Sequence, residues 1–192
     1  MVARLPALLL IGMQNDHFPG GLAPLEGIEA VAPKAAALLA QFRENDWPRF
    51  HVQHVSIRPG ANHCVAGCCG VEFHDSLAPL PDEPVIVKHV ANCFRDTTLH
   101  DDLWERDVGE LVVAGACTHL CVDAAVRHAV DFGFACNVIE DACIARSVSH
   151  GGRTVSATDV HAAHLATLAG SYARVLSLEA WLARRHPEAL AA

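Results

Sequence analysis

Residues 111–121 read Leu-Val-Val-Ala-Gly-Ala-Cys-Thr-His-Leu-Cys, and this stretch decides the fold. Its first half is a continuous apolar run, which is typical of a strand buried on both faces of a parallel sheet. A tight turn follows at Gly115, and a helical pattern runs from Thr118 to Phe132. A strand, a turn and a helix in this order predict a βαβ unit with Cys121 in the first turn of the helix.

Outward from this stretch, apolar runs and helical patterns alternate along the whole chain, as they do in parallel α/β sheets. Strands are expected at Ala7–Met13, Arg49–Val55, Pro84–Lys88, Glu110–Gly115, Ala135–Glu140 and Ala173–Ser177. Helices are expected at Ile28–Asn45, Thr98–Arg106, Thr118–Phe132, Thr158–Ala169 and from Ser177 to a point before Pro187. We therefore expect one α/β domain over residues 1–192, a parallel sheet with helices on both faces.

Composition narrows the class of protein. Hydrophobic residues make up 52% of the chain, which favours a sheet covered on both faces and further apolar surface buried between subunits of a homodimer or larger homo-oligomer. The net charge is -8 and no basic run occurs, so nucleic acid is not an expected partner. No apolar run approaches the ~18 residues of a membrane span, and Ala7–Ile11 is too short for a secretion signal. The eight cysteines are then expected to be reduced thiols of a cytoplasmic protein.

Two residues stand where a parallel sheet presents its chemistry, at the carboxyl ends of strands. Cys121 lies in a first helical turn, where the partial positive charge of the helix end lowers a thiol pKa and favours the thiolate. A small buried residue is the plainer interpretation of Cys121. Lys88 closes a predicted strand, and a lysine there can promote ionisation of a nearby thiol. An ordinary lysine at a strand end is the plainer interpretation of Lys88.

Three motifs in this order resemble the isochorismatase-like hydrolase family, over roughly residues 7–183. They are the strand 8–16 (LLLIGMQND), Lys88 with the segment 92–99 (NCFRDTTL), and the nucleophile segment 115–124 (GACTHLCVDA). The resemblance implies a Rossmann-like three-layer sandwich with a six-stranded parallel sheet. It also implies a cysteine hydrolase that cleaves C–N bonds of a small amide without a cofactor.

The resemblance also assigns roles to residues. Cys121 would attack the carbonyl carbon to form a thioester, and Lys88 would tune the charge. The backbone amides of Cys117 and Cys121 would form the oxyanion hole, and the Ala116–Cys117 peptide bond is the candidate for a cis bond found in similar proteins. One departure is informative, because Gly12 stands at the position of the family's catalytic Asp. Three explanations stay open: an inactivated variant, a natural pseudoenzyme that binds a small molecule or a partner, or another group such as Asp16 that reaches the site.

Other residues are weaker candidates. Phe18, His54 and Phe94 are candidates for a substrate pocket, and for the two phenylalanines core packing is the plainer interpretation. The irregular stretch 56–75 is long enough to be functional or a subunit contact. It is rich in His and Cys, but the spacing fits no standard zinc motif, so we expect no metal.

Overall fold

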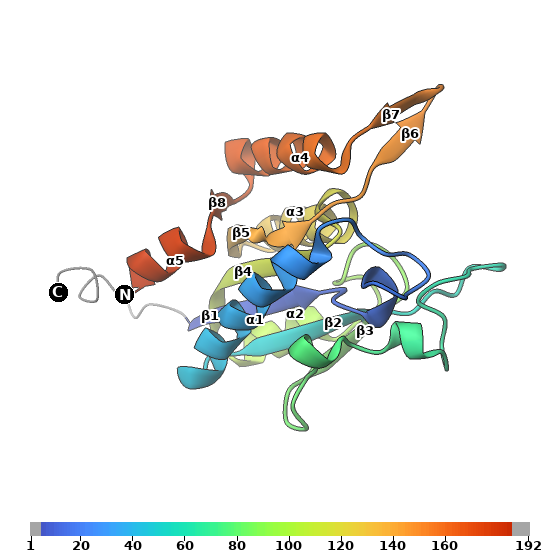
Figure 1. Cartoon of the computed structure of the whole chain (residues 1–192). Coiled ribbons are helices and arrows are strands. Elements are labelled where there is room, and N and C mark those ends of the chain that lie inside the picture. Colours follow the sequence, from blue (N-terminus) through green and yellow to red (C-terminus); the bar gives the residue numbers. More distant parts are fainter. Residues whose placement is uncertain (1–4, 186–192) are drawn as a thin grey trace.

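The computed structural model describes residues 5–185, and its centre is a sheet of six parallel strands in the order β3-β2-β1-β4-β5-β8 (Figure 1). The strands are β1 (Leu5–Ile11), β2 (Arg49–His54), β3 (Val85–Lys88), β4 (Val108–Ala116), β5 (Ala135–Ile144) and β8 (Arg174–Leu176). All six predicted strands are confirmed, with β5 running four residues further than expected. A short antiparallel hairpin, β6 (Val148–His150) with β7 (Arg153–Val155), was not predicted and is exposed throughout.

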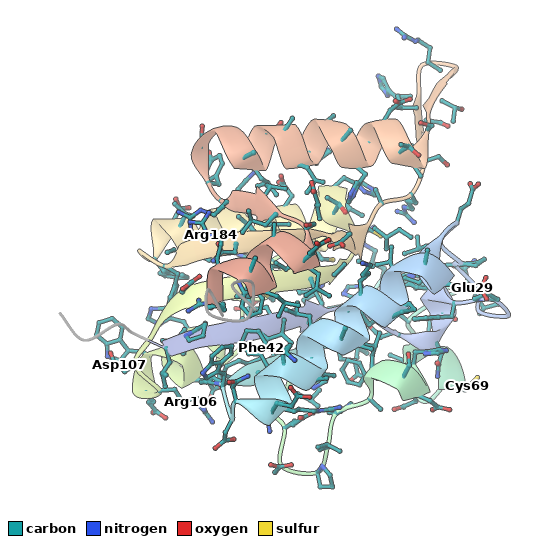
Figure 2. All side chains as sticks on the ribbon, turned by 60° about the vertical axis from the view of Figure 1, so that its left-hand side comes forward. Glu29, Phe42, Cys69, Arg106, Asp107 and Arg184 are labelled. Atoms are coloured by element: carbon teal, nitrogen blue, oxygen red, sulfur yellow. The ribbon has the colours of Figure 1, made fainter. Side chains whose placement is uncertain are left out.

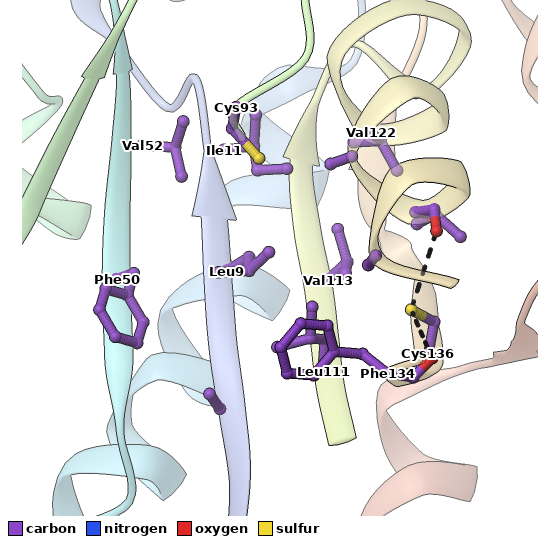
Figure 3. Packing of buried hydrophobic residues seen from close by; sticks show 14 of the residues in the cluster. Leu9, Ile11, Phe50, Val52, Cys93, Leu111, Val113, Val122, Phe134 and Cys136 are labelled. Carbon is purple, nitrogen blue, oxygen red and sulfur yellow. Dashed lines mark hydrogen bonds between the residues drawn. The ribbon is translucent and has the colours of Figure 1, made fainter. Parts of the chain in front are cut away.

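Helices cover both faces of the sheet, as predicted. They are α1 (Ile28–Glu44), α2 (Leu99–Glu105), α3 (Asp123–Asp131), α4 (Ala157–Ser171) and α5 (Leu178–Arg185). Side chains of the strands alternate between two apolar clusters. One cluster takes in α2, α3 and α4, and Figure 3 shows part of it, with Leu9, Val52 and Val113 on neighbouring strands. The other lies under α1 and α5, where the rings of Phe42 and Trp181 stack at 5.6 Å.

The strand order places a topological switch between β1 and β4. The chain winds from β1 to β2 and β3 on one side, then crosses to β4, β5 and β8 on the other. Open α/β sheets bind ligands beyond the carboxyl ends of their strands at such a point. Gly12 directly follows β1, and Cys117 directly follows β4. The position of Gly12 and the segment that begins at Cys117 are therefore neighbours in space.

The irregular stretch 56–75 lies at this carboxyl end. It contains a 3₁₀ turn at Cys69–Val71, and Phe73 forms an isolated bridge with Gln14 just after β1. Figure 2 shows Cys69 at one end of the sheet and Asp107 at the opposite end, before β4. Among residues 5–185, no helix is long and apolar enough to cross a membrane. Pro187, before which the last helix was expected to end, lies outside the described residues.

Candidate active site

The centre of the candidate site is a contact between an ammonium group and a thiol. Lys88, the last residue of β3, is only 1% exposed, and its Nζ donates to the Sγ of Cys121 at 3.1 Å and to the carbonyl oxygen of Val90 at 3.0 Å. No carboxylate of the described residues forms an ion pair with Lys88. A buried ammonium needs a compensating charge. The ammonium group lies at hydrogen-bond distance from the sulfur of Cys121, where it would stabilise negative charge formed on that sulfur during a reaction.

The segment that carries Cys121 is an uncommon turn. The peptide bond between Ala116 and Cys117 is cis. Thr118–Val122 forms a single π-helical turn that continues directly into α3, so the predicted single helix begins as a wider turn. The amides of Leu120 and Val122 donate to the carbonyl oxygen of Cys117 at 3.0 and 3.2 Å, which closes the turn. π-turns occur often at functional sites.

A second hydrogen bond ties this turn to α4. The Thr118 hydroxyl lies 2.9 Å from the Nδ1 of His161. Burial lowers the pKa of His161 below its ordinary value, so its ring is neutral near pH 7. The nucleophile segment is thus held from two sides, by β4 and by α4.

The backbone at position 12 requires a glycine, in addition to the functional consequence of the missing carboxylate. Its φ is +64°, in the left-handed region, and an added Cβ would lie 2.7 Å from the carbonyl oxygen of Ala116. Gly115 on β4 is crowded by β1 in turn, because its added Cβ would lie 2.0 Å from the carbonyl oxygen of Ile11. Only glycine fits such positions without strain. The ends of β1 and β4 therefore approach so closely here that the backbone leaves no room for a side chain at either position.

Asp16 is occupied elsewhere. Its buried carboxylate accepts hydrogen bonds from the backbone amides of Leu22 and Cys64, one on each oxygen. Gly70 packs directly against it, with space for no Cβ. Asp16 therefore anchors two loops, and none of its hydrogen bonds runs to Lys88 or Cys121.

His54 stands beside Lys88. The two residues are directly paired in the parallel ladder between β2 and β3. The side chain of Gln14 holds the backbone of His54 from both sides, donating to its carbonyl oxygen at 2.9 Å and accepting from its amide at 2.8 Å. Burial, and then the positive charge of Lys88, lower the pKa of His54 to about 4. The Nδ1 of His54 is buried and has no hydrogen-bond partner among the described residues.

Cys121 differs from the thiols around it. Burial raises the pKa of Cys64 to about 11 and the pKa values of Cys93 and Cys117 to about 12. These three thiols are therefore protonated and inert near neutral pH. Cys121 is partly exposed and touches an ammonium group. It is the cysteine of this group that is placed to react.

The predicted pocket residues do not all come together. Phe18 stacks on His74 at 3.8 Å and lines a hollow of about 1090 Å³ between loop 15–22 and α1, a hollow that neither Lys88 nor Cys121 lines. Phe94 is buried against Phe132 in the core. Of the three, only His54 is placed directly beside Lys88.

Arg146 lies near the site, because its charge reaches Cys117. It follows β5 in an exposed loop, and its charge reaches Cys117, His17 and His119, whose pKa values it influences. No ion pair of Arg146 occurs within the described part of the chain. Among these residues, no group of three or more His, Cys, Asp or Glu side chains is arranged to hold a metal ion.

Comparisons with known proteins show which family this chain resembles in sequence and in structure. The family model "Isochorismatase domain" matches residues 6–180. The isochorismatase family protein YddQ of Bacillus subtilis is 46% identical over 176 residues, covering 92% of this chain and 98% of that protein. Maleamate amidohydrolase of Pseudomonas putida is 30% identical, covering 91% of this chain and 84% of that enzyme. A solved structure from Oleispira antarctica, named as an isochorismatase hydrolase, superposes with a TM-score of 0.90 at 40% identity, covering 95% of this chain and 98% of that one.

Proposed function

Because the chain belongs to the isochorismatase family, we propose that it is a cysteine hydrolase that acts on the C–N bond of a small amide through a thioester on Cys121, with an activity impaired by Gly12. The observation that carries this proposal is the 3.1 Å contact between the Nζ of Lys88 and the Sγ of Cys121. A relative, maleamate amidohydrolase, is named for the hydrolysis of a C–N bond, which supports the reaction class.

The proposed reaction has two halves. In the first, the Cys121 sulfur attacks the carbonyl carbon of the substrate, and the amides of Cys117 and Cys121 hold the oxygen that gains negative charge. The C–N bond breaks, the departing nitrogen takes a proton from solvent, and the acyl group stays on the sulfur. In the second half, water attacks the thioester, the acid is released, and Lys88 stabilises the thiolate that returns.

Gly12 predicts that this chain handles amides poorly. The family resemblance expects a carboxylate there that gives a proton to the departing amine. Acid–base catalysis contributes typically 10²–10⁴-fold, so about 3–5 kcal/mol of the barrier for an amide is left unsupported. Leaving groups that depart without a proton, such as phenolates, escape this penalty. The same glycine is the observation that favours the alternative, a family member that binds a small molecule or a partner without turnover.

The test is ammonia release from a panel of small amides, by the chain as it stands and by Gly12→Asp, with Cys121→Ser as the inactive control. Cys68→Ser, which removes an exposed thiol that forms no hydrogen bond with Lys88, controls for general thiol loss. We expect slow, Cys121-dependent release of ammonia from the chain as it stands. Gly12→Asp adds the carboxylate against the close contact at residue 12, so its folding is checked by thermal unfolding, and the folded variant should release ammonia faster. Silence from both active-site versions over the panel supports the binding alternative.

A further inference from the structure

Hydrolysis of the acyl-enzyme needs a base that removes a proton from water, and the position expected to supply it is Gly12. We propose that His54 is this base. This inference rests on the proposed function, because it concerns the second half of the same reaction. Three observations carry it: the register of β2 with β3, the state of the His54 ring, and the engagement of Asp16.

The register of β2 with β3 places His54 beside Lys88. His54 and Lys88 are directly paired, and paired residues of parallel strands project their side chains on the same face of the sheet. The Lys88 ammonium touches the sulfur that would carry the acyl group. The amide of Gly12 donates to the carbonyl oxygen of Val52, two residues before His54, at 2.9 Å. His54 thus lies beside Lys88, two residues after the point where β2 accepts a hydrogen bond from Gly12.

The His54 ring is available for chemistry rather than for folding. Gln14 bonds only the His54 backbone, so the local fold does not depend on the imidazole. The buried Nδ1 has no partner among the described residues, and buried polar atoms are seldom left so without a reason.

The charges around His54 keep it in the basic form. The groups that face it are Lys88, His63, His17 and His89, all of which are cationic or neutral. Together with burial they hold the pKa of His54 at about 4, close to the ~3.9 of an ordinary aspartate. The imidazole is therefore neutral near pH 7 and can accept a proton.

The competing carboxylate is not free for this task. Both oxygens of Asp16 accept backbone amides, and using them for proton transfer would release the loops at Leu22 and Cys64. His54 therefore remains as the base beside Lys88.

The proposed step balances as follows. His54 takes a proton from water as the water oxygen bonds to the acyl carbon, and the carbonyl electron pair moves to oxygen. The tetrahedral intermediate collapses, the C–S bond breaks with its electron pair on the Cys121 sulfur, and Lys88 stabilises that charge. The acid leaves, and His54 returns its proton to solvent.

The test uses p-nitrophenyl acetate, whose nitrophenolate leaves without a proton. The burst of nitrophenolate measures acylation of Cys121, and the steady-state rate measures hydrolysis of the thioester. We expect His54→Gln to keep the burst and to lose about 100-fold or more in the steady-state rate. His150→Gln is the matched control, because it removes an exposed imidazole of the β6–β7 hairpin that has no part in the proposed step, and it should leave both phases unchanged.

The outcomes are distinguishable. A burst followed by an unchanged steady state in His54→Gln overturns the role of His54 and leaves the cysteine hydrolase standing. Absence of a Cys121-dependent burst in the unaltered chain overturns the proposed function and this inference with it. If His54→Gln does not fold, the pH profile of the unaltered chain decides: the steady-state rate should persist down to about pH 5 and fall as His54 protonates near pH 4. A rate that is lost already between pH 7 and 6 contradicts the inference.

Discussion

Replacing Gly12 by alanine or aspartate should destabilise the protein, because the backbone there is shaped for glycine. The left-handed conformation costs a non-glycine residue roughly 1–2 kcal/mol. The contact of 2.7 Å between the added Cβ and the Ala116 carbonyl oxygen forces the ends of β1 and β4 apart, an overpacking effect of about 1–3 kcal/mol. We therefore expect a loss of about 2–5 kcal/mol for Gly12→Ala, and slightly less for Gly12→Asp, since aspartate tolerates this conformation better.

The assay is thermal unfolding of both variants beside the unaltered chain. In a protein of this size, 1 kcal/mol corresponds to about 2–4 °C, so the Tm should fall by roughly 4–20 °C. Gly20→Ala is the matched control, since Gly20 has a φ of +90° with nothing within 4 Å of its added Cβ. It shares the conformational cost but not the contact, so it should cost less than Gly12→Ala. A Gly12→Ala variant as stable as the unaltered chain would refute the close approach of β1 and β4.

Three further predictions follow from other parts of the structure. Burial alone would raise the pKa of Glu83, but hydrogen bonds from Arg43 and Arg49 outweigh burial and leave that pKa well below its ordinary value. The stability that Glu83 contributes is thus present above pH ~4.3 and is lost as pH falls below it. Glu83→Gln should therefore cost about 3–5 kcal/mol in urea unfolding at pH 7, but much less at low pH. Equal costs at the two pH values would contradict this account. Thr118→Val removes the bond to the His161 ring and should cost about 1–3 kcal/mol with a smaller acylation burst, whereas an unchanged burst would show that α4 does not position the nucleophile turn. We also expect a homodimer or larger assembly in light-scattering measurements, and a monomer mass at micromolar concentration would contradict it.

The fold was predictable because its strands carry a pattern that periodicity detects. Continuous apolar runs such as residues 111–116 mark strands buried on both faces, and the alternation with helices fixes the parallel arrangement. The β6–β7 hairpin was not predicted because its residues are exposed, and its sequence lacks the apolar periodicity that distinguishes a strand from a loop. The extension of β5 to Ile144 escaped because Glu140 and Asp141 interrupt the apolar run.

The site was predictable in part, for a similar reason. Lys88 and Cys121 end or follow apolar strands, so their meeting at the sheet edge follows from the topology. The fit of Gly12 against Ala116 depends on a close backbone approach that no local pattern encodes. The role of Asp16 as a loop anchor likewise depends on amides 6 and 48 residues away along the chain. The pairing of His54 with Lys88 required the register of two strands.

The central claim is that Cys121 carries the acyl group, and mass spectrometry of the intact protein after brief exposure to p-nitrophenyl acetate tests it most directly. The contact with Lys88 predicts a single acetyl group, located on Cys121 by peptide mapping and absent from both Cys121→Ser and Lys88→Met. Acetylation spread over the exposed Cys68 and Cys69, or undiminished in Lys88→Met, would contradict the claim.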